Sequence, residues 1–480
     1  MKLKEYFVIE RNILKVSAIV VFCVFSILLF WKYRLGDDSY IYLQYVKNII
    51  SHQELSFNTG TKSYGFTSPL WLFLLTIGGL ILKELTWSPI FLGFICNLVS
   101  LFIWLKILGR IFLDKKVFFL FCVIVALEPV YLKHTFFGME TALVYLFSTL
   151  ILLLLLNKTN FKNISLWFGL FILVRPESIL LYLFFIIYYP KNNKRDLLIG
   201  LILFSLVNIP WLVFAKIYFN DIFTTTFMAK AGGWDLSNIV YSNIKEGVLI
   251  LSFNYLPLLV IIFFYCFKQN KKKTNKTTLK KISLAICILM FVFYCIFIKK
   301  EFIYSRYFAI FIPFGLLYFA AIIDSFKHAK TVLTIVALWF FCSNVFQSYM
   351  IEKTFIPSEK TEDEIINWVN KETLPVDKIA YGRIGKLAFY TDRKIIDPQG
   401  IINPDIIKYD KRGILFEYYY KHKPDYFISG FYGVSLDTLK KYSYVEERKR
   451  IIKNKSHLIR TSFQNYNNVD TIKIYKINWY

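Results

Sequence analysis

Two neighbouring acidic residues, Asp37 and Asp38, are the side chains in this sequence best suited to proton transfer. They open a stretch in which apolar residues from Tyr42 to Ile50 recur at helical spacing, which predicts an amphipathic helix on the outer membrane surface. An ionised aspartate within reach of a hydroxyl group can remove its proton as a new bond forms. Asp37 lies seven residues before Gln44, on the polar face, so we expect Asp37 to be the base and Asp38 to cap or support the helix.

Basic residues on predicted turns between apolar runs are the natural partners of such a base. A phosphate leaving group departs as an anion, so it needs positive charge and N–H donors rather than a general acid. Glu140 and Glu177 lie beside two of these turns and are further candidates for the site. The basic candidates for binding the phosphate or another part of the substrate are His134, Arg175, Lys230 and Arg306.

Each of these residues also has a purely structural explanation. Arg175 precedes Pro176 and could pair with Glu177 at a helix break, whereas the long basic side chains elsewhere could extend to lipid headgroups. Asp37 and Asp38 could do no more than cap a helix. A divalent cation, Mg²⁺ or Mn²⁺, is an open expectation at either aspartate, because oxygen ligands suit both ions, but the sequence contains no closed ligand set.

The composition requires that these residues be positioned by membrane helices. Of the 480 residues, 56% are hydrophobic and only 19% are charged, which excludes an ordinary soluble protein. The net charge of +25 comes largely from lysines in short loops between apolar runs, where they determine topology, so no nucleic-acid partner is expected. All seven cysteines fall in or at the ends of apolar runs, so we expect neither a disulfide framework nor a zinc site.

The apolar runs predict a polytopic α-helical protein. The stretch Leu70–Leu82 is too short to cross a bilayer, so we expect it to be re-entrant or interfacial within the first external loop, residues 32–68. Basic clusters assign the N-terminus to the cytoplasm. Roughly eleven crossings are expected, namely Val16–Phe30, Pro89–Leu108, Val117–Tyr131, Thr141–Leu156, Ile164–Val174, Ile179–Tyr189, Leu197–Phe214, Val248–Phe267, Ile282–Ile298, Phe308–Ile323 and Thr331–Phe346.

The sequence divides into a membrane domain, residues 1–349, and a small α/β domain, residues 350–480, which the alternation of crossings places outside the cytoplasm. The second domain mixes one helix-like stretch with short strand-like ones. These stretches are Glu362–Val369 for the helix and Lys378–Tyr381, Tyr426–Ser429 and Thr471–Tyr475 for the strands.

Several motifs in chain order resemble those of the GT-C superfamily of membrane glycosyltransferases, and in particular the mycobacterial terminal arabinofuranosyltransferase and its relatives. The first loop supplies "GDDSYIYLQYVKNI", "FNTG" and "YGFTSPLW". The resemblance continues through "FGMETAL", "LVRPES", "TTTFMAKAG", "SRYF" and "GKLAFYTDRKIIDPQGIINPD", so it spans nearly the whole chain. One departure is Gln44, where the family often has arginine.

The resemblance implies a function and its site. Such relatives transfer sugars from polyprenyl-phosphate donors outside the cytoplasmic membrane, use the first-loop aspartate as the proposed base and invert the anomeric centre. It implies a bacterial inner-membrane enzyme with membrane lipid around it and an envelope glycan or lipid as acceptor. The implied site residues are Asp37, Asp38, Glu140, Arg175, Glu177, Lys230 and Arg306.

Two other classes of function stay open at this point. A transporter or flippase of lipid-linked glycans places charged residues and broken helices near the bilayer midplane, often in repeated halves, whereas here they are expected at one outer face. A non-catalytic scaffold that displays the C-terminal domain would need no acidic pair in the first loop.

Overall fold

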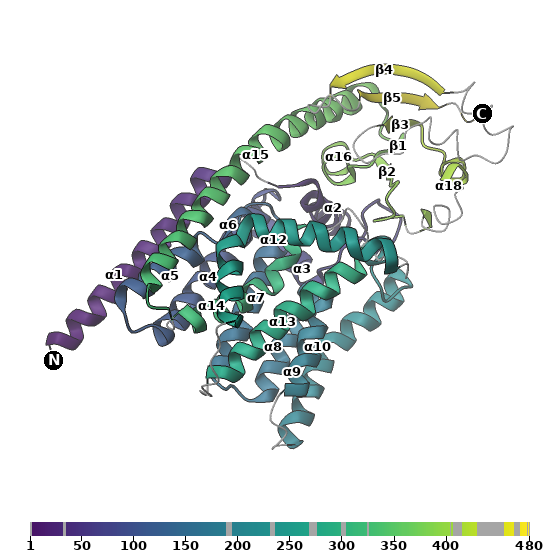
Figure 1. The fold of residues 1–480 in the computed structure, drawn as a ribbon. Coiled ribbons are helices and arrows are strands. Elements are labelled where there is room, and N and C mark those ends of the chain that lie inside the picture. The colour runs from purple at the N-terminus through teal and green to yellow at the C-terminus, as the bar shows by residue number, and fades with distance from the viewer. Residues whose placement is uncertain are drawn as a thin grey trace.

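Helices form most of the structure, a computed structural model that describes most of the chain. Figure 1 shows a helical body with the C-terminal strands above one side of it. The described residues are 2–31, 35–188, 194–230, 236–267, 276–298, 304–323, 326–403, 405–406, 415–429, 456–464, 471–477 and 479.

The first half of the chain is helical from α1 to α9, and two elements between these are short irregular helices. In chain order they are α1 (Lys2–Phe25), η1 (Ser26–Phe30), α2 (Asp37–His52), α3 (Pro69–Leu82), α4 (Trp87–Ile111), α5 (Lys115–Ala126), α6 (Pro129–Lys133), α7 (Thr141–Leu156), α8 (Phe161–Val174), η2 (Pro176–Ser178) and α9 (Ile179–Tyr188).

The second half continues the helical body and then ends in a region of short strands. The helices of the body are α10 (Lys194–Phe219), α11 (Thr225–Lys230), α12 (Leu236–Phe267), α13 (Lys276–Phe297), η3 (Ser305–Ile310), α14 (Ile312–Ile323) and α15 (Ala329–Glu372). The rest are β1 (Lys378–Ala380), α16 (Ile384–Thr391), β2 (Lys394–Ile396), α18 (Leu415–His422), β3 (Tyr426–Ser429), β4 (Ser456–Gln464) and β5 (Thr471–Ile477).

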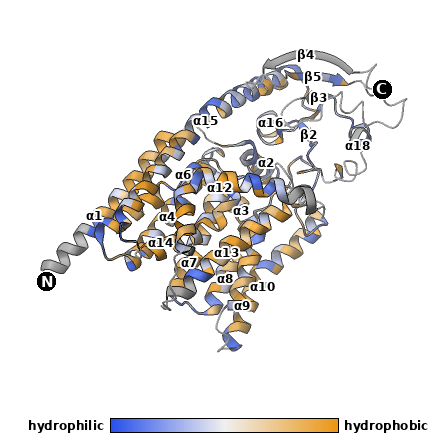
Figure 2. Cartoon of the chain, in the orientation of Figure 1, coloured by the Kyte–Doolittle hydropathy of each residue, from blue (hydrophilic) through white to orange (hydrophobic). Residues whose placement is uncertain are grey.

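The apolar helices have the dimensions of membrane spans, and the protein is a multi-pass membrane protein. Figure 2 shows hydrophobic residues concentrated along the helices of the body and fewer of them in the C-terminal region. Six described helices are long and apolar enough to cross a bilayer. Five shorter apolar helices accompany them: Pro69–Leu82, Thr141–Leu156, Phe161–Val174, Pro176–Tyr188 and Ile312–Ile323. Each of the eleven predicted runs contains a helix.

The prediction of one continuous helix over Val117–Tyr131 is wrong. The helix breaks at Glu128, where α5 has ended and α6 begins with Pro129 as its first residue. The Glu128 carboxylate accepts hydrogen bonds from the N–H groups of Val130 and Tyr131, at 3.0 and 2.8 Å, so it caps α6. The buried carboxylate and the following proline together explain the break.

The last span and the helix predicted in the C-terminal domain are one helix. α15 runs for 44 residues and lies beside α1, with the rings of Phe25 and Phe341 5.5 Å apart (Figure 1). It continues past the end of the apolar run at Phe346 and carries a proline, Pro357, inside it. The predicted boundary at residues 349 and 350 therefore falls within a continuous helix.

A mixed five-stranded sheet follows α15, as the α/β prediction for this region requires. The strand order is β2-β1-β3-β5-β4, with β1 parallel to β2 and β3 and with β5 antiparallel to β3 and β4. The three strand-like stretches of the sequence correspond to β1, β3 and β5. We call the described part of residues 378–477 the C-terminal unit.

The predicted helix in the first loop is confirmed as α2, but its surroundings differ from the prediction. Gln44 and Asn48, on its polar face, are buried, and their amide groups donate to the carbonyl oxygen of Phe57. Lys47, on the same face, forms an ion pair of 2.5 Å with Asp392 of the C-terminal unit. At these three residues the polar face of α2 therefore contacts protein. The prediction had this face exposed to water.

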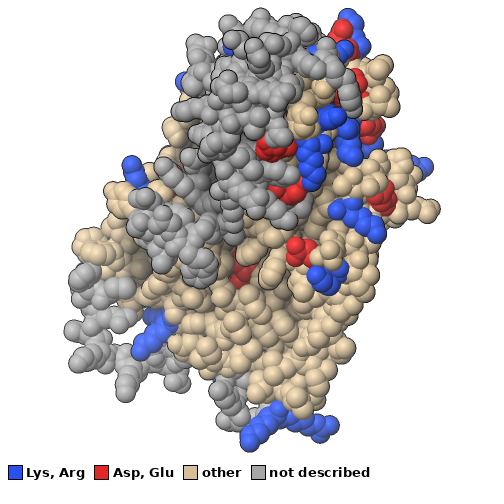
Figure 3. All heavy atoms as spheres, turned by 90° about the vertical axis from the view of Figure 1, so that its right-hand side faces the viewer, with Lys and Arg blue, Asp and Glu red and all other residues tan. Residues whose placement is uncertain are grey.

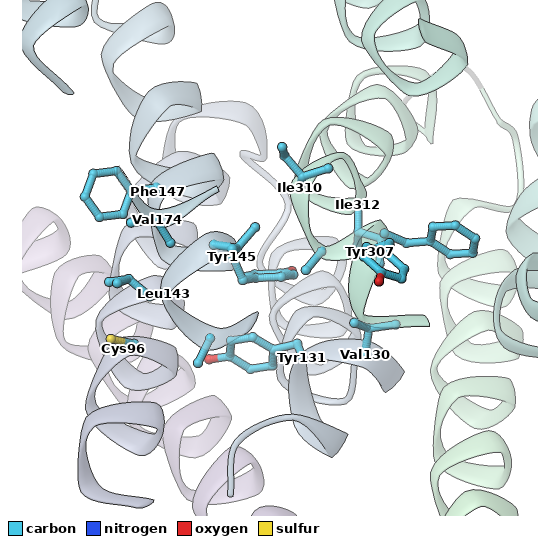
Figure 4. Close-up of a cluster of buried hydrophobic side chains, with 14 of the residues drawn as sticks. Cys96, Val130, Tyr131, Leu143, Tyr145, Phe147, Val174, Tyr307, Ile310 and Ile312 are labelled. Atoms are coloured by element: carbon cyan, nitrogen blue, oxygen red, sulfur yellow. The ribbon is translucent and has the colours of Figure 1, made fainter. Parts of the chain in front are cut away.

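A buried aromatic core fixes the helices that carry the candidate site. Figure 4 shows Tyr131 and Tyr145 one above the other, with Ile310 and Tyr307 beside them on a neighbouring segment. The Tyr131 and Tyr145 ring centroids are 4.8 Å apart. The Ser148 hydroxyl donates to the carbonyl oxygen of Ile310 at 2.9 Å, and this bond ties α7 to η3, the element that carries Arg306.

Candidate functional site

The first turn of α2 is held against the turn that precedes α7. The Gly36 N–H donates to the Phe137 carbonyl oxygen at 3.3 Å, and the Ser39 hydroxyl donates to the same oxygen. Gly138 has φ +77°, and a Cβ there would lie 2.4 Å from Cδ2 of Leu35. Glycine is therefore required in this turn, and the turn holds the start of α2 beside the start of α7.

Arg175 lies at the break between α8 and η2, where Pro176 begins the new helix. Its guanidinium group is bound on two sides, by Glu140 Oε1 at 2.6 Å from Nη1 and by Glu177 Oε1 at 3.1 Å from Nε. The Tyr294 hydroxyl donates to the same Glu177 oxygen at 3.2 Å. The structure therefore realises the predicted pairing of Arg175 with Glu177 and adds Glu140 to it.

Arg306 pairs with Asp38 across the same region. The distance from Arg306 Nη1 to Asp38 Oδ2 is 2.9 Å. The Tyr307 ring lies near both arginines, with its centroid 5.0 Å from Cζ of Arg175 and 5.7 Å from Cζ of Arg306. An aromatic face near each cation stabilises both positive charges.

These ion pairs line one end of a cavity of about 510 Å³. Its charged end is formed by Asp38, Glu140, Arg175, Glu177 and Arg306. Much of the rest of the wall is apolar. Helices α8, α9, α10 and α13 contribute Ile172, Leu173, Ile179, Leu180, Phe204, Trp211, Leu212, Phe293 and Phe297. The first loop and residues 222–227 also line the cavity, with both apolar and polar side chains. The cavity thus suits a ligand with an anionic, hydroxyl-bearing head and a long hydrocarbon chain.

Charged side chains gather at one end of the described surface. Figure 3 shows most of the acidic and basic residues in the upper and middle part of this face, whereas the lower part has few charges apart from basic groups on its left side and at its lower end. The charged half is the side of the molecule that carries the C-terminal strands (Figure 1). The candidate site belongs to that half, because its residues lie at the start of α2, directly before α7, and at or within η2 and η3.

Glu140 lines the cavity and has a buried carboxylate oxygen that could accept a further hydrogen bond. The residue is 1% exposed, and its Oε2 atom has no hydrogen-bond partner among the described residues. A buried acceptor of this kind is costly unless a donor reaches it. A ligand hydroxyl or amino group at the charged end of the cavity would supply that donor.

Asp37 points away from the cavity and contacts the C-terminal unit. Its Oδ1 atom accepts a hydrogen bond from the N–H of Lys386 at 2.8 Å, at the start of α16. It is not among the residues that line the cavity. Burial raises the pKa of Asp37 to about 6, against the lowering effect of the nearby Arg383.

Two of the predicted basic residues are not part of the described wall. His134 is buried and does not line the cavity; its ring is 5.4 Å from that of Phe137, and burial lowers its pKa well below the usual range. An uncharged imidazole that does not reach the cavity is a poor phosphate ligand. Lys230 is the last residue of α11, and its side chain lies outside the described residues.

The described residues contain no group of three histidine, cysteine, aspartate or glutamate side chains placed to hold a metal ion. Asp37 and Asp38 have different partners, an α16 amide and Arg306. The two aspartates therefore do not converge on one position in this structure.

Three further residues of the wall were missed in the sequence. Tyr307 directly follows Arg306 in "SRYF", so the motif itself was a signal for it. Tyr294 lies inside an apolar run, and nothing in the sequence distinguishes it from other aromatic residues there. Ile401, from the "DPQGII" segment of the C-terminal unit, also lines the cavity, but only tertiary structure brings it there.

Comparison with known proteins identifies the fold of the chain but not its activity. Residues 353–475 match a family model described as a domain of unknown function, DUF8728. No curated protein sequence matches the chain. Crystal structures of ArnT from Cupriavidus metallidurans are similar over nearly the whole length of both chains.

The apo ArnT structure has a TM-score of 0.64 and 11% sequence identity, and the similarity covers 99% of this chain and 98% of ArnT. For ArnT bound to undecaprenyl phosphate, the TM-score is 0.65, the identity is 11%, and the similarity covers 97% of each chain. Identity this low supports a shared architecture and nothing finer. The chain has an ArnT-like GT-C fold of membrane helices with a small C-terminal sheet region.

Proposed function

We propose that this protein is a membrane glycosyltransferase that moves a sugar from a polyprenyl-phosphate carrier to an acceptor hydroxyl group. The observation that carries the proposal is the cavity, whose wall combines a cluster of ion-paired side chains with many apolar residues from membrane helices. A lipid-linked phosphate sugar has the same division into an anionic sugar head and a hydrocarbon chain. The ArnT structure with undecaprenyl phosphate supports such a donor for this fold.

Asp38 is the base in this proposal, and Asp37 is not. Only Asp38 of the pair lines the cavity. As the acceptor oxygen attacks the anomeric carbon, its proton passes to the Asp38 carboxylate, and the bond from the anomeric carbon to the phosphate oxygen breaks. The polyprenyl phosphate leaves with the bonding electrons, and attack from the face opposite the leaving group inverts the anomeric centre.

Arg306 binds the donor phosphate and in doing so controls the base. Without substrate, its guanidinium group is paired with Asp38. A phosphate oxygen competes for the same N–H donors, since charge-assisted bonds to phosphate are strong. Sharing Arg306 with the phosphate weakens its hold on Asp38, so the carboxylate becomes a better proton acceptor when the donor is in place.

Glu140 and Arg175 position the sugar in this mechanism. The unpartnered Oε2 atom of Glu140 accepts a bond from a sugar hydroxyl group, and Arg175 holds Glu140 and Glu177 in place. The resemblance to arabinofuranosyltransferases makes a polyprenyl-phosphate pentofuranose the first donor to test. The acceptor is an envelope glycan or lipid outside the bacterial inner membrane, with the N-terminus in the cytoplasm.

A transporter or flippase of lipid-linked glycans is the alternative function. The described charged residues of the cavity cluster at one end, whereas a transport path would need polar groups along its length. This distribution favours the enzyme.

The test compares undecaprenyl phosphate with undecaprenol, which lacks only the phosphate. Both are added to the purified full-length protein in lipid nanodiscs, and binding is measured by native mass spectrometry. The proposal expects the phosphate to bind at least tenfold more tightly, followed by sugar transfer when a polyprenyl-phosphate sugar and an acceptor glycan are supplied. Equal binding of the two lipids would overturn the proposed donor.

A further inference from the structure

The C-terminal unit makes its most direct contact with the candidate site through Asp37. The side chain accepts the N–H of Lys386 at 2.8 Å and lies within electrostatic reach of Arg383. Gly385 lies so close to α2 that a Cβ there would be 2.1 Å from the Asp37 carbonyl oxygen. The start of α16 is thus packed directly against the first turn of α2.

α16 is in turn fixed to α15 by ion pairs whose basic partners have little exposure to solvent. Arg383 Nη2 is 2.5 Å from Glu359 and 2.7 Å from Glu362, and Lys386 Nζ is 2.8 Å from Glu359 and 2.7 Å from Asp363. Glu362 is fully buried, and the Arg383 and Lys386 side chains are at most 10% exposed. These pairs make α16 a rigid connection between the long helix and the first loop.

Further contacts extend this interface along the first loop. The Asn58 amide pairs with the backbone of Ile395 in β2, donating to its carbonyl oxygen at 2.9 Å and accepting its N–H at 3.0 Å. Lys47 pairs with Asp392 and also donates to the Phe389 carbonyl oxygen at 2.9 Å. The C-terminal unit therefore contacts both α2, at Lys47, and the loop that follows it, at Asn58.

Beyond β2, a compact loop of residues 397–403 reaches the cavity. The Asp397 carboxylate accepts hydrogen bonds from the N–H groups of Gln399 and Ile402, at 2.7 and 2.9 Å, which hold the loop in shape. The Ile401 carbonyl oxygen accepts a hydrogen bond from the Thr225 hydroxyl, and Ile401 is one of the residues that line the cavity. A Cβ on Gly65 would lie 2.9 Å from the Ile401 carbonyl oxygen, so the contact with the first loop requires glycine.

We propose that the C-terminal unit completes the active site of the proposed glycosyltransferase. Asp37 is a positioning residue, because α16 holds it and thereby fixes the first turn of α2. Neighbouring residues on a helix project about 100° apart, so Asp37 can hold α16 while Asp38 faces the cavity. Ile401 forms a wall against which the bound donor packs. The expected effect on sugar transfer rests on the proposed function. The structural role of Asp37, which is to hold α16 against α2, rests on the interface alone.

The first test uses Asp37→Ala and Asp37→Asn in the full-length protein. Asparagine can still accept the Lys386 N–H and alanine cannot, so hydrogen exchange of residues 384–391 should be faster in Asp37→Ala and close to wild type in Asp37→Asn. In the transfer assay, Asp37→Ala should lower kcat roughly 10-fold to 100-fold with little change in the KM for the donor, and Asp37→Asn should restore most of the rate. Wild-type exchange and kcat in Asp37→Ala would overturn the positioning role.

The second test compares Ile401→Ala with Gln399→Ala, a change in the same loop at a residue that does not line the cavity. Loss of the apolar contact should raise the KM for the donor roughly 4-fold to 10-fold in Ile401→Ala, whereas Gln399→Ala should match wild type. Equal KM values in the two variants would contradict the proposal that the donor packs against Ile401. If the wild-type protein transfers no sugar, the proposed function fails, and hydrogen exchange at residues 384–391 still decides whether Asp37 holds the C-terminal unit.

Discussion

Replacing Arg306 with methionine tests the phosphate contact, because it removes the charge and keeps a long side chain. Arg306 makes its ion pair with Asp38 at 2.9 Å, and the two side chains are 14% and 39% exposed. The site is thus partly shielded from water, and one charge-assisted contact to a phosphate should be worth about 2 to 3 kcal/mol. The expected loss in affinity for undecaprenyl phosphate is therefore about 30-fold to 150-fold.

The assay measures the dissociation constants of undecaprenyl phosphate and undecaprenol for the wild type, Arg306→Met and Arg306→Lys. Lysine keeps the positive charge but lacks the planar guanidinium group. The affinity of Arg306→Lys for undecaprenyl phosphate should therefore lie between those of wild type and Arg306→Met. The affinity for undecaprenol should be the same in all three proteins, since it has no phosphate. An Arg306→Met variant that binds undecaprenyl phosphate as tightly as wild type would refute the assignment of Arg306.

Three other predictions concern the framework of the site. Gly138→Ala should destabilise the protein by more than about 1 kcal/mol in thermal unfolding, because φ is +77° and the new Cβ would meet Leu35; a wild-type melting temperature would contradict this. Burial raises the pKa of Asp37 to about 6, so the stability that this group contributes is lost as the pH rises through that value. The melting temperature of wild type, relative to that of Asp37→Asn, should therefore decrease as the pH is raised from about 4 to about 7. A difference in melting temperature that does not vary with pH would contradict the raised pKa of Asp37. Reporter fusions after Lys116 and after Ser358 should read cytoplasmic and extracytoplasmic respectively, and a cytoplasmic signal after Ser358 would reverse the orientation.

Local pattern was enough to predict the elements that carry the site. Helical spacing predicted α2, and β-branched and aromatic stretches predicted β1, β3 and β5. The basic residues on interhelical turns were found by the same means, and Arg175 and Arg306 do meet acidic side chains there. These features depend on residues close in sequence, so the sequence alone contains the signal.

The direction in which the two aspartates point depends on residues far away in the chain. The polar face of α2 was expected to meet water and substrate, and this expectation favoured Asp37 as the base. In the structure Asp37 and Lys47 instead bind α16 and Asp392 of the C-terminal unit, more than 300 residues later in the chain. Composition and periodicity predict that a face will be polar, but they do not predict which polar surface covers it.

The length of α15 could not be predicted for a different reason. Hydropathy marks where a helix leaves the hydrocarbon region, near Phe346, but it does not mark where the helix itself ends. The chain stays helical to Glu372, through Pro357, because Glu359, Glu362 and Asp363 bind α16.

In the proposed mechanism Asp38, which lines the cavity, accepts the proton from the acceptor hydroxyl group. The most direct test measures sugar transfer from a polyprenyl-phosphate donor by Asp38→Asn and Asp37→Asn, two isosteric changes at neighbouring positions, with thermal stability measured alongside. Asp38→Asn should fold normally and lose roughly 100-fold to 10,000-fold in kcat, whereas Asp37→Asn should keep most of its activity. The reverse result, with Asp37→Asn inactive and Asp38→Asn active, would contradict this account and restore Asp37 as the base.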